Sequence, residues 1–346
     1  MFDFRLVLVY DKNKRMSKKK EKITVIGGGT GSFTVLSGLK KYPVDLSAIV
    51  AMTDSGGSNR VIRDELGLLP TSDIRQCLIA LSEGEKEQPL RRLFMYRFSR
   101  GNGLNGMTFG NLFLAALSDI FGSQMEAIKK TSQVLKIKGK ILPVTLTDTN
   151  LAAVYENGKK VIGEGFIDEP KHSGKLKISK VFLRPKAKIC PEAKKAILRS
   201  DLVVIGPGDL YTSIIAALLT ESMAKTLKKT KAKVVYVMNL MTRCGQTLDF
   251  TAKDHVRILE KYLGKDCLDF ILVNTRPIPQ KALIKYKKEK EVPVIDDLED
   301  SYFKVIRKDL LSEKETKRVP GDILKRSLIR HDSNKLARAI LKILKF

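Results

Sequence analysis

The chain has 346 residues, with 64 Lys and Arg against 38 Asp and Glu, so its formal net charge is +26 at pH 7. No apolar run reaches the roughly 20 residues that a membrane-spanning helix needs, so we expect no membrane insertion. The lysines are spread along the chain and mixed with acids, and no nucleic-acid-binding motif accompanies them. This pattern predicts solvated basic faces and no nucleic-acid partner.

The cysteines indicate the redox state of the compartment in which the protein is found. The four of them lie far apart in the sequence and form no CxxC pair. This spacing argues against a zinc site and favours a reduced protein in the cytoplasm.

The first 21 residues are expected to stand apart from the fold. They contain a short apolar stretch preceded by Asp3, which is not the charge pattern of a signal peptide. Met16 opens a second basic segment just before the first clear strand, so translation from Met1 and from Met16 both remain open. We predict that residues 1–21 are a basic, disordered extension and that 22–346 form a single domain.

Strand and helix patterns alternate over the first 120 residues. Short β-branched runs indicate strands, and amphipathic stretches between them indicate helices. The expected strands are Ile23–Ile26 and Leu46–Met52. The expected helices are Ser32–Lys41, Ser72–Leu81, Leu90–Phe98 and Asn111–Ile120.

The pattern of the middle of the chain, about 140–185, predicts a small β-rich insertion or an edge of the sheet. The dipeptide Asn157-Gly158 is a strong signal for a tight hairpin turn. The strand-like segments of this region are Lys140–Thr145, Ala152–Tyr155, Lys160–Ile167 and Lys177–Leu183.

Alternation then resumes to the end of the chain. The expected helices are Ala187–Arg199, one from about Tyr211, and Ser333–Leu344. The expected strands are Leu202–Ile205, Lys233–Met238, Phe270–Val273 and Val292–Ile295. Strands separated by helices predict an α/β fold with a doubly wound, mostly parallel, Rossmann-like sheet.

Two glycine-rich turns follow strands and precede helices. The first is Gly27-Gly28-Gly29-Thr30-Gly31, and the second is Gly206-Pro207-Gly208-Asp209. Glycines let a ligand approach the backbone closely, and a helix that starts there presents free N–H groups to an anion. Tyr211 lies in the first turn of the second helix, facing the same ligand. The alternative is that the glycines only allow tight turns and close packing.

Polar residues follow other strands at the same edge of the sheet. Asp54 follows the second strand, and Asp64, ten residues later, is a candidate to join it around Mg²⁺, which prefers oxygen ligands. Asn111 and Asn239 are candidates to bond a base or phosphate. The alternatives are that Asp54 and Asn111 cap a turn and a helix, that Asp64 is a helix-face acid, and that Asn239 satisfies local backbone.

Taken together, these motifs resemble the gluconeogenesis factor family (YvcK), a branch of the CofD-like superfamily of 2-phospho-L-lactate transferases. The resemblance covers about residues 22–341 through many motifs in fixed order. They include VIGGGTG at 25–31, TDSGGS at 53–58, VIGPGDLYTS at 204–213 and RHDSNKLARAIL at 330–341.

The resemblance implies a nucleotide pocket lined by Gly28–Gly31, Asn111, Gly206, Gly208 and Asn239. Tyr286 and Arg330 match family positions associated with UDP-sugar binding, and a guanidinium suits a diphosphate. The family has Asp-Asp where this chain has Asp54-Ser55, which removes one candidate metal ligand.

The resemblance also implies a function. Family members bind UDP-sugars such as UDP-N-acetylglucosamine and support carbon metabolism and cell-wall or cell-shape maintenance. The CofD branch moves a 2-phospholactyl group from a nucleotide carrier to a deazaflavin alcohol with Mg²⁺. We therefore expect a regulatory protein that binds a nucleotide-diphosphate sugar, with a CofD-like transferase as the alternative. A nicotinamide oxidoreductase is disfavoured by the imperfect dinucleotide fingerprint, and whether the chain forms a homo-oligomer stays open.

Overall fold

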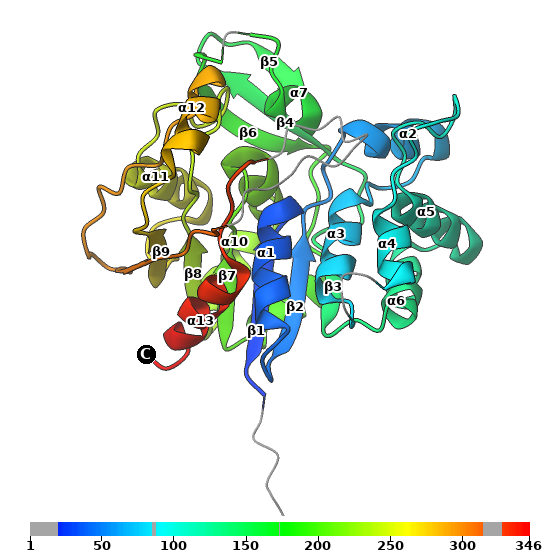
Figure 1. The fold of residues 1–346 in the computed structure, drawn as a ribbon, viewed down its shortest axis with the longest axis horizontal. Coiled ribbons are helices and arrows are strands. Elements are labelled where there is room, and N and C mark those ends of the chain that lie inside the picture. Colours follow the sequence, from blue (N-terminus) through cyan, green and yellow to red (C-terminus); the bar gives the residue numbers. More distant parts are fainter. Residues whose placement is uncertain (1–19, 85–87, 173, 314–326) are drawn as a thin grey trace, which may run out of the picture.

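The computed structural model describes residues 20–84, 88–172, 174–313 and 327–346 (Figure 1). Nearly all of the predicted N-terminal extension, including both candidate start residues, lies outside these ranges. Within them, no helix combines the length and apolarity needed to cross a membrane.

A seven-stranded sheet forms the centre of the molecule, and every pair of neighbouring strands in it is parallel. Its order is β10-β9-β8-β7-β1-β2-β3. The strands are β1 (Lys22–Gly27), β2 (Asp45–Val50), β3 (Lys140–Pro143), β7 (Leu202–Ile205), β8 (Lys233–Val237), β9 (Phe270–Asn274) and β10 (Lys304–Lys308). The predicted doubly wound parallel fold is confirmed.

The chain reverses its direction of travel across the sheet between β1 and β7. It first runs outward from β1 through β2 to β3, then returns to place β7 on the other side of β1 and continues to β10. In open α/β sheets the loops that leave two such strands separate and create a crevice at their carboxyl ends. Both glycine-rich turns leave from these two strands.

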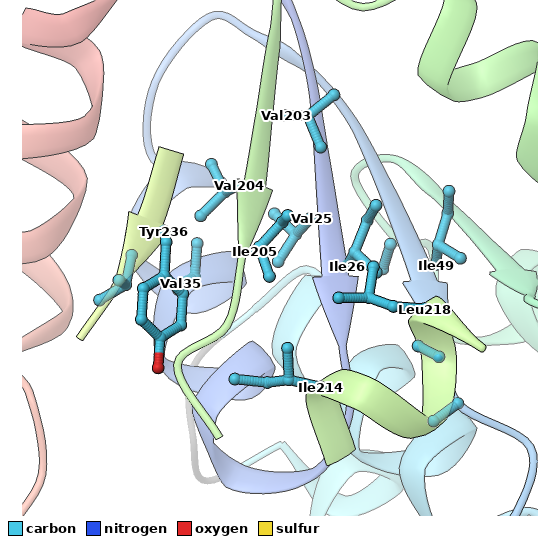
Figure 2. Packing of buried hydrophobic residues seen from close by; sticks show 14 of the residues in the cluster. Val25, Ile26, Val35, Ile49, Val203, Val204, Ile205, Ile214, Leu218 and Tyr236 are labelled. Carbon is cyan, nitrogen blue, oxygen red and sulfur yellow. The ribbon is translucent and has the colours of Figure 1, made fainter. Parts of the chain in front are cut away.

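Helices cover both faces of the sheet, and apolar side chains fill the two interfaces (Figure 2). On one face Val25 and Val204 pack against Val35 of the helix that follows β1. On the other face Ile26 and Ile49 face Ile214 and Leu218, which lie in the helical segment that follows β7. The strands are apolar on both sides because both faces are covered.

The helices on the described chain are mostly short. They are α1 (Gly29–Leu39), α2 (Gly57–Leu66), α3 (Ser72–Leu81), α4 (Pro89–Met95), α5 (Phe109–Phe121), α6 (Gln124–Val134), α7 (Glu164–Asp168), α8 (Pro191–Leu198), π-helix η1 (Leu210–Ile215), α9 (Ala216–Leu218), α10 (Met223–Lys229), α11 (Ala252–Leu263), α12 (Gln280–Lys288) and α13 (Ser333–Ile343).

A small antiparallel sheet lies beyond the carboxyl ends of the main strands, at the top of Figure 1. It has the order β5-β4-β6, with β4 (Asn150–Tyr155), β5 (Lys160–Ile162) and β6 (Ile178–Arg184). The turn at Asn157-Gly158 joins β4 to β5 as predicted. Helix α7 follows β5 and contacts the loop after β2.

Four details differ from the sequence expectations. The segment Lys140–Thr145 contributes β3 to the main sheet and is not part of the small one. The predicted strand Lys160–Ile167 ends at Ile162, because Gly163 turns the chain with φ of +110° into α7. Val292–Ile295 is not a strand; Pro293 removes an N–H there, and only an isolated bridge to Met241 forms. The last main strand is β10, whose Lys-rich exposed sequence gives little apolar signal.

Candidate anion-binding site

A cavity of about 390 Å³ opens at the carboxyl ends of β1 and β7, where the chain reverses direction. Its lining combines the two glycine turns, the loop after β2, the first turn of α3, helix α7 and the segment 327–331. Of the residues predicted for the site, nine line it: Gly28, Gly29, Thr30, Gly31, Asp54, Gly208, Asn239, Tyr286 and Arg330. The crevice is therefore where parallel-sheet geometry places it.

The first glycine turn starts a helix directly at the cavity. Helix α1 begins at Gly29, which has φ of +58°, a conformation that glycine adopts without strain. The N-cap residue Gly28 has no side chain to cap this end, and the first N–H groups of an α-helix have no partner within the helix itself. The partial positive charge of the helix N-terminus adds to these donors and favours an anion.

The second glycine turn touches the first one. A Cβ added to Gly31 would lie 1.8 Å from the carbonyl oxygen of Pro207 and 3.1 Å from the nitrogen of Gly208. Only a glycine lets the two backbones approach so closely. Asn239 holds the second turn in place, because its side-chain amide donates a 2.8 Å hydrogen bond to the carbonyl of Gly208.

The segment that carries Arg330 closes the cavity on another side. The buried hydroxyl of Tyr286 accepts hydrogen bonds from the backbone N–H groups of Leu328, at 2.9 Å, and Ile329, at 3.2 Å. Tyr286 therefore fixes the backbone just before Arg330. Burial lowers the pKa of the neighbouring His331 to about 4, so its imidazole is neutral at physiological pH.

Carboxylates also line the cavity. Asp54 follows β2, Asp73 lies in the first turn of α3, and Glu164 and Asp168 lie in α7. A Cβ added to Gly28 would lie 2.0 Å from an oxygen of Asp73, so this carboxylate sits directly over the N-terminus of α1.

Hydrogen bonds attach α7 to the loop after β2. The hydroxyl of Ser55 accepts a 3.1 Å hydrogen bond from Gly165, and the N–H of Ser55 donates to Glu164 at 3.5 Å. Burial, then the charges of Asp54, Asp168 and Asp73, raise the pKa of Glu164 well above its usual range. Glu164 therefore retains a proton at pH values where an exposed glutamate has lost it.

A buried arginine balances part of this acidity. Arg243 donates to Asp168 at 3.1 Å and lies 3.5 Å from Glu291. Burial alone would lower the pKa of Arg243, but Asp168, Asp209 and Glu291 together raise it above its usual range. Burial, with Asp168 as a further cause, raises the pKa of Asp209 to about 6.

Three predicted pocket residues lie outside the cavity. Asn111 is fully buried and is a structural link: it accepts from Arg75 at 2.9 Å and donates to Ser58 at 2.8 Å and to Ser72 at 2.9 Å. These bonds join α5 to the starts of α2 and α3. Gly206, with φ of +73°, only shapes the turn, and the buried Tyr211 packs within the core.

The residues do not fit the predicted magnesium site. Asp64 lies about two turns along α2, exposed and away from the cavity, so it does not join Asp54. One oxygen of Asp54 accepts a 2.9 Å hydrogen bond from Gly56 and closes the local turn. In the ranges that the structure describes, no three His, Cys, Asp or Glu side chains are grouped to hold a metal ion.

The sequence pattern does not predict most of the acidic residues that line the cavity. It places Asp73 only at the start of a helix, and it predicts the end of a strand where α7 lies. A signal was present, since Glu164 and Asp168 are four residues apart and so share one helix face. Nothing in the local pattern indicates that Arg243 pairs with Asp168.

The fold and the two touching glycine turns define a doubly wound α/β protein with a cavity at its switch point. A family model described as 2-phospho-L-lactate transferase CofD matches residues 23–311. The chain therefore belongs to the CofD family, and within it resembles the proteins named gluconeogenesis factor.

Two relatives and one solved structure illustrate the similarity. The chain is 40% identical over 332 residues to the gluconeogenesis factor of Bacillus subtilis (strain 168), covering 94% of this chain and 99% of that one. It is 40% identical over 325 residues to the gluconeogenesis factor of Halalkalibacterium halodurans, covering 94% and 97%. The crystal structure of a UPF0052-family protein from Bacillus halodurans superposes with a TM-score of 0.84 at 37% identity, covering 94% and 99%.

Proposed function

We propose that this chain is a cytoplasmic regulatory protein that binds a UDP-sugar. The observation that carries the proposal is the direct contact between the Gly28–Gly31 turn and the Pro207–Gly208 turn at one cavity. Two turns with exposed backbone and one helix N-terminus suit the two phosphates of a nucleoside diphosphate. Arg330 adds a guanidinium, which can hold phosphate oxygens through two parallel hydrogen bonds.

The acidic side of the cavity supports the sugar part of the proposal. Ionised carboxylates only accept hydrogen bonds, and sugar hydroxyls can donate to them. Asp54 and Asp168 therefore complement hydroxyls, while the glycine turns complement phosphates. A ligand with an anionic centre and several hydroxyl groups satisfies both sides, and free phosphate satisfies only one.

The names of the relatives support the metabolic part of the biological setting, which belongs to the same proposal. Two of them carry the name gluconeogenesis factor. We propose that this chain supports growth on gluconeogenic carbon sources and cell-wall or cell-shape maintenance by sensing the level of a UDP-sugar. A deletion strain that grows normally on such carbon sources would count against this role, independently of ligand binding.

Calorimetric titration tests the binding. UDP-N-acetylglucosamine should bind in the micromolar range or tighter, UDP more weakly and uridine weakest, because each step removes groups that the cavity complements. Binding should be the same in EDTA and in Mg²⁺, and the ligand should be recovered intact. Equal affinity for uridine and for the UDP-sugar would refute a diphosphate site.

The second candidate is a CofD-like transferase, which the family match favours. The cavity also holds groups suited to proton transfer, because Glu164 has a raised pKa and lies beside the carboxylate of Asp54. Incubation with a nucleotide-linked phospholactate and a deazaflavin alcohol distinguishes the two. Mg²⁺-dependent consumption of both would establish the transferase, and recovery of both unchanged would leave the regulatory role.

A further inference from the structure

A second cavity, of about 630 Å³, lies at the opposite end of the main sheet. It is lined by the amino ends of β1, β2 and β3 and by helices α6 and α8. No residue of it belongs to the site described above.

The sheet surface in this cavity is polar where a covered sheet is normally apolar. Thr24 and Ser47 are neighbours on β1 and β2, two residues before Ile26 and Ile49. Residues two apart on a strand face the same side, so one sheet face changes from isoleucine to hydroxyl side chains within one step. Thr24 is buried and makes a 2.6 Å hydrogen bond to Ser200, which lies just after α8. This hydrogen bond fixes the positions of the Thr24 and Ser200 hydroxyls in the cavity lining.

Part of each side wall is apolar. Met125 and Ile128 of α6 and Ala196 of α8 line the cavity, together with Leu142 of β3. Such a wall favours a hydrocarbon portion of a ligand, because apolar groups leave water on binding.

Basic side chains surround this cavity. The lining includes five basic residues and only two acids, Asp45 and Glu192. Lys129 pairs with Glu126 at 2.6 Å. Four other basic side chains make no hydrogen bond or ion pair with the described part of the chain: Lys22, Lys140, Lys195 and Arg199. Cations around one cavity attract an anion.

We propose that this cavity binds a small organic anion, a phosphate ester or carboxylate with a short hydrocarbon body. The hydrocarbon lies against Met125 and Ile128, and the anionic group meets Lys140 and Arg199 at the opening. Charge complementarity selects this ligand class over a neutral amphiphile. The acidic lining of the other cavity makes that site a poor alternative for a simple aliphatic anion.

Calorimetry with the full chain tests the proposal using hexyl phosphate, hexanoate and 1-hexanol as probes. At least one of the two anions should bind at millimolar concentration or below, and 1-hexanol should bind at least tenfold more weakly. The stronger anion identifies the preferred head group. Equal binding of 1-hexanol, or no binding of either anion at 10 mM, the highest probe concentration (chosen as about tenfold above the expected range), would overturn the proposal.

Three variants locate the binding. Lys140→Ala combined with Arg199→Ala should weaken the anion at least tenfold, whereas Lys194→Ala combined with Lys180→Ala should not. Both pairs remove two exposed positive charges, but the second pair lies outside the cavity. Ala196→Phe should also abolish binding by filling the space without changing charge. Unchanged affinity in the first and third variants, with their melting temperatures intact, would place the anion elsewhere.

Discussion

The two sides of the cavity at the carboxyl ends of β1 and β7 offer opposite chemistry. One side consists of backbone from Gly28–Gly31 and Gly208, where N–H groups at the start of α1 can donate. The other side consists of carboxylates from Asp54, Asp73 and α7, which can accept, and the Asp73 carboxylate borders the first side at Gly28. The first side is built by turns that touch each other, and the second by elements from distant parts of the chain.

This contrast limits the ligand more than either side does alone. An anion without hydroxyl groups would meet the carboxylates and be repelled, and a neutral sugar would leave the amide donors without a charged partner. A nucleotide sugar presents phosphates to one side and hydroxyls to the other. Variants that change one side at a time therefore test the comparison directly.

The largest effect is expected from a substitution that forces the two glycine turns apart. In Gly31→Ala the new methyl would lie 1.8 Å from the Pro207 oxygen, so the two turns must separate. UDP-sugar affinity should fall at least about 100-fold, and overpacking should cost roughly 1–3 kcal/mol of stability. Gly103→Ala is the control, because a Cβ there meets nothing within 4 Å. If calorimetry gave the two variants the same affinity, the turns would not form the phosphate site.

The next effect concerns the guanidinium of Arg330, which lines the cavity and is proposed to hold the phosphates. Arg330→Ala should weaken UDP-N-acetylglucosamine by about 2 kcal/mol, roughly 30-fold, because a charge-assisted hydrogen bond is lost. The affinity for uridine should change little, since uridine carries no phosphate. Arg330→Lys should recover only part of the affinity, because an ammonium cannot form two parallel hydrogen bonds. Equal losses for UDP-sugar and uridine in calorimetry would assign Arg330 to the nucleoside.

Tyr286 should act through Arg330. Tyr286→Phe removes the acceptor of the Leu328 and Ile329 N–H groups, so the segment carrying Arg330 is held less firmly. We expect about 5–10-fold weaker binding, close to 1 kcal/mol. In the double variant with Arg330→Ala the Tyr286 effect should nearly vanish, which a double-mutant cycle measures. Fully additive losses would show that Tyr286 contacts the ligand itself.

The donor side could be predicted from the sequence, because each of its parts is local. A β-branched run, a glycine-rich turn and an amphipathic helix occur within 20 residues around Gly28–Gly31, and again around Gly206–Gly208. Parallel-sheet geometry then places both turns at one edge. That the two turns touch depends on β7 returning beside β1, which no local pattern encodes.

The acceptor side could not be predicted in the same way. Asp73, Glu164 and Asp168 meet only because α7 descends from the small sheet onto the loop after β2. The same dependence on tertiary structure explains Asn111: its sequence context resembles a pocket residue, but the packing of α2, α3 and α5 buries it as a link. Strand β10 was missed because edge strands carry a weak apolar pattern.

Removing one carboxylate from the acceptor side should strengthen anion binding. Asp73 lies over the N-terminus of α1, where it repels the incoming diphosphate. Asp73→Asn should tighten UDP-sugar binding by about 1 kcal/mol, roughly fivefold, at low salt, and less at high salt. Asp64→Asn, which removes an exposed carboxylate outside the cavity, should change nothing. Weaker binding in Asp73→Asn would mean that the ligand uses this carboxylate as an acceptor.

The smallest effect concerns the proton on Glu164, and its sign can be worked out. Burial, and then Asp54, Asp168 and Asp73, raise the pKa of Glu164 above the ordinary value of 4.5, so the folded chain holds a proton that the unfolded chain releases. The stability from this proton is complete below pH 4.5 and is lost as the pH rises through the raised pKa. Glu164→Gln keeps an acceptor for Ser55 and cannot ionise.

The melting temperature of Glu164→Gln should therefore match that of the parent protein near pH 4.5 and exceed it by about 2 °C near pH 8. Calorimetric scans across that range measure the difference. Glu169→Gln, at an exposed carboxylate directly after α7, should show no such trend. A constant difference for Glu164→Gln at all pH values would mean that α7 does not hold Glu164 against the other carboxylates, and the acceptor side would then lose its central contact.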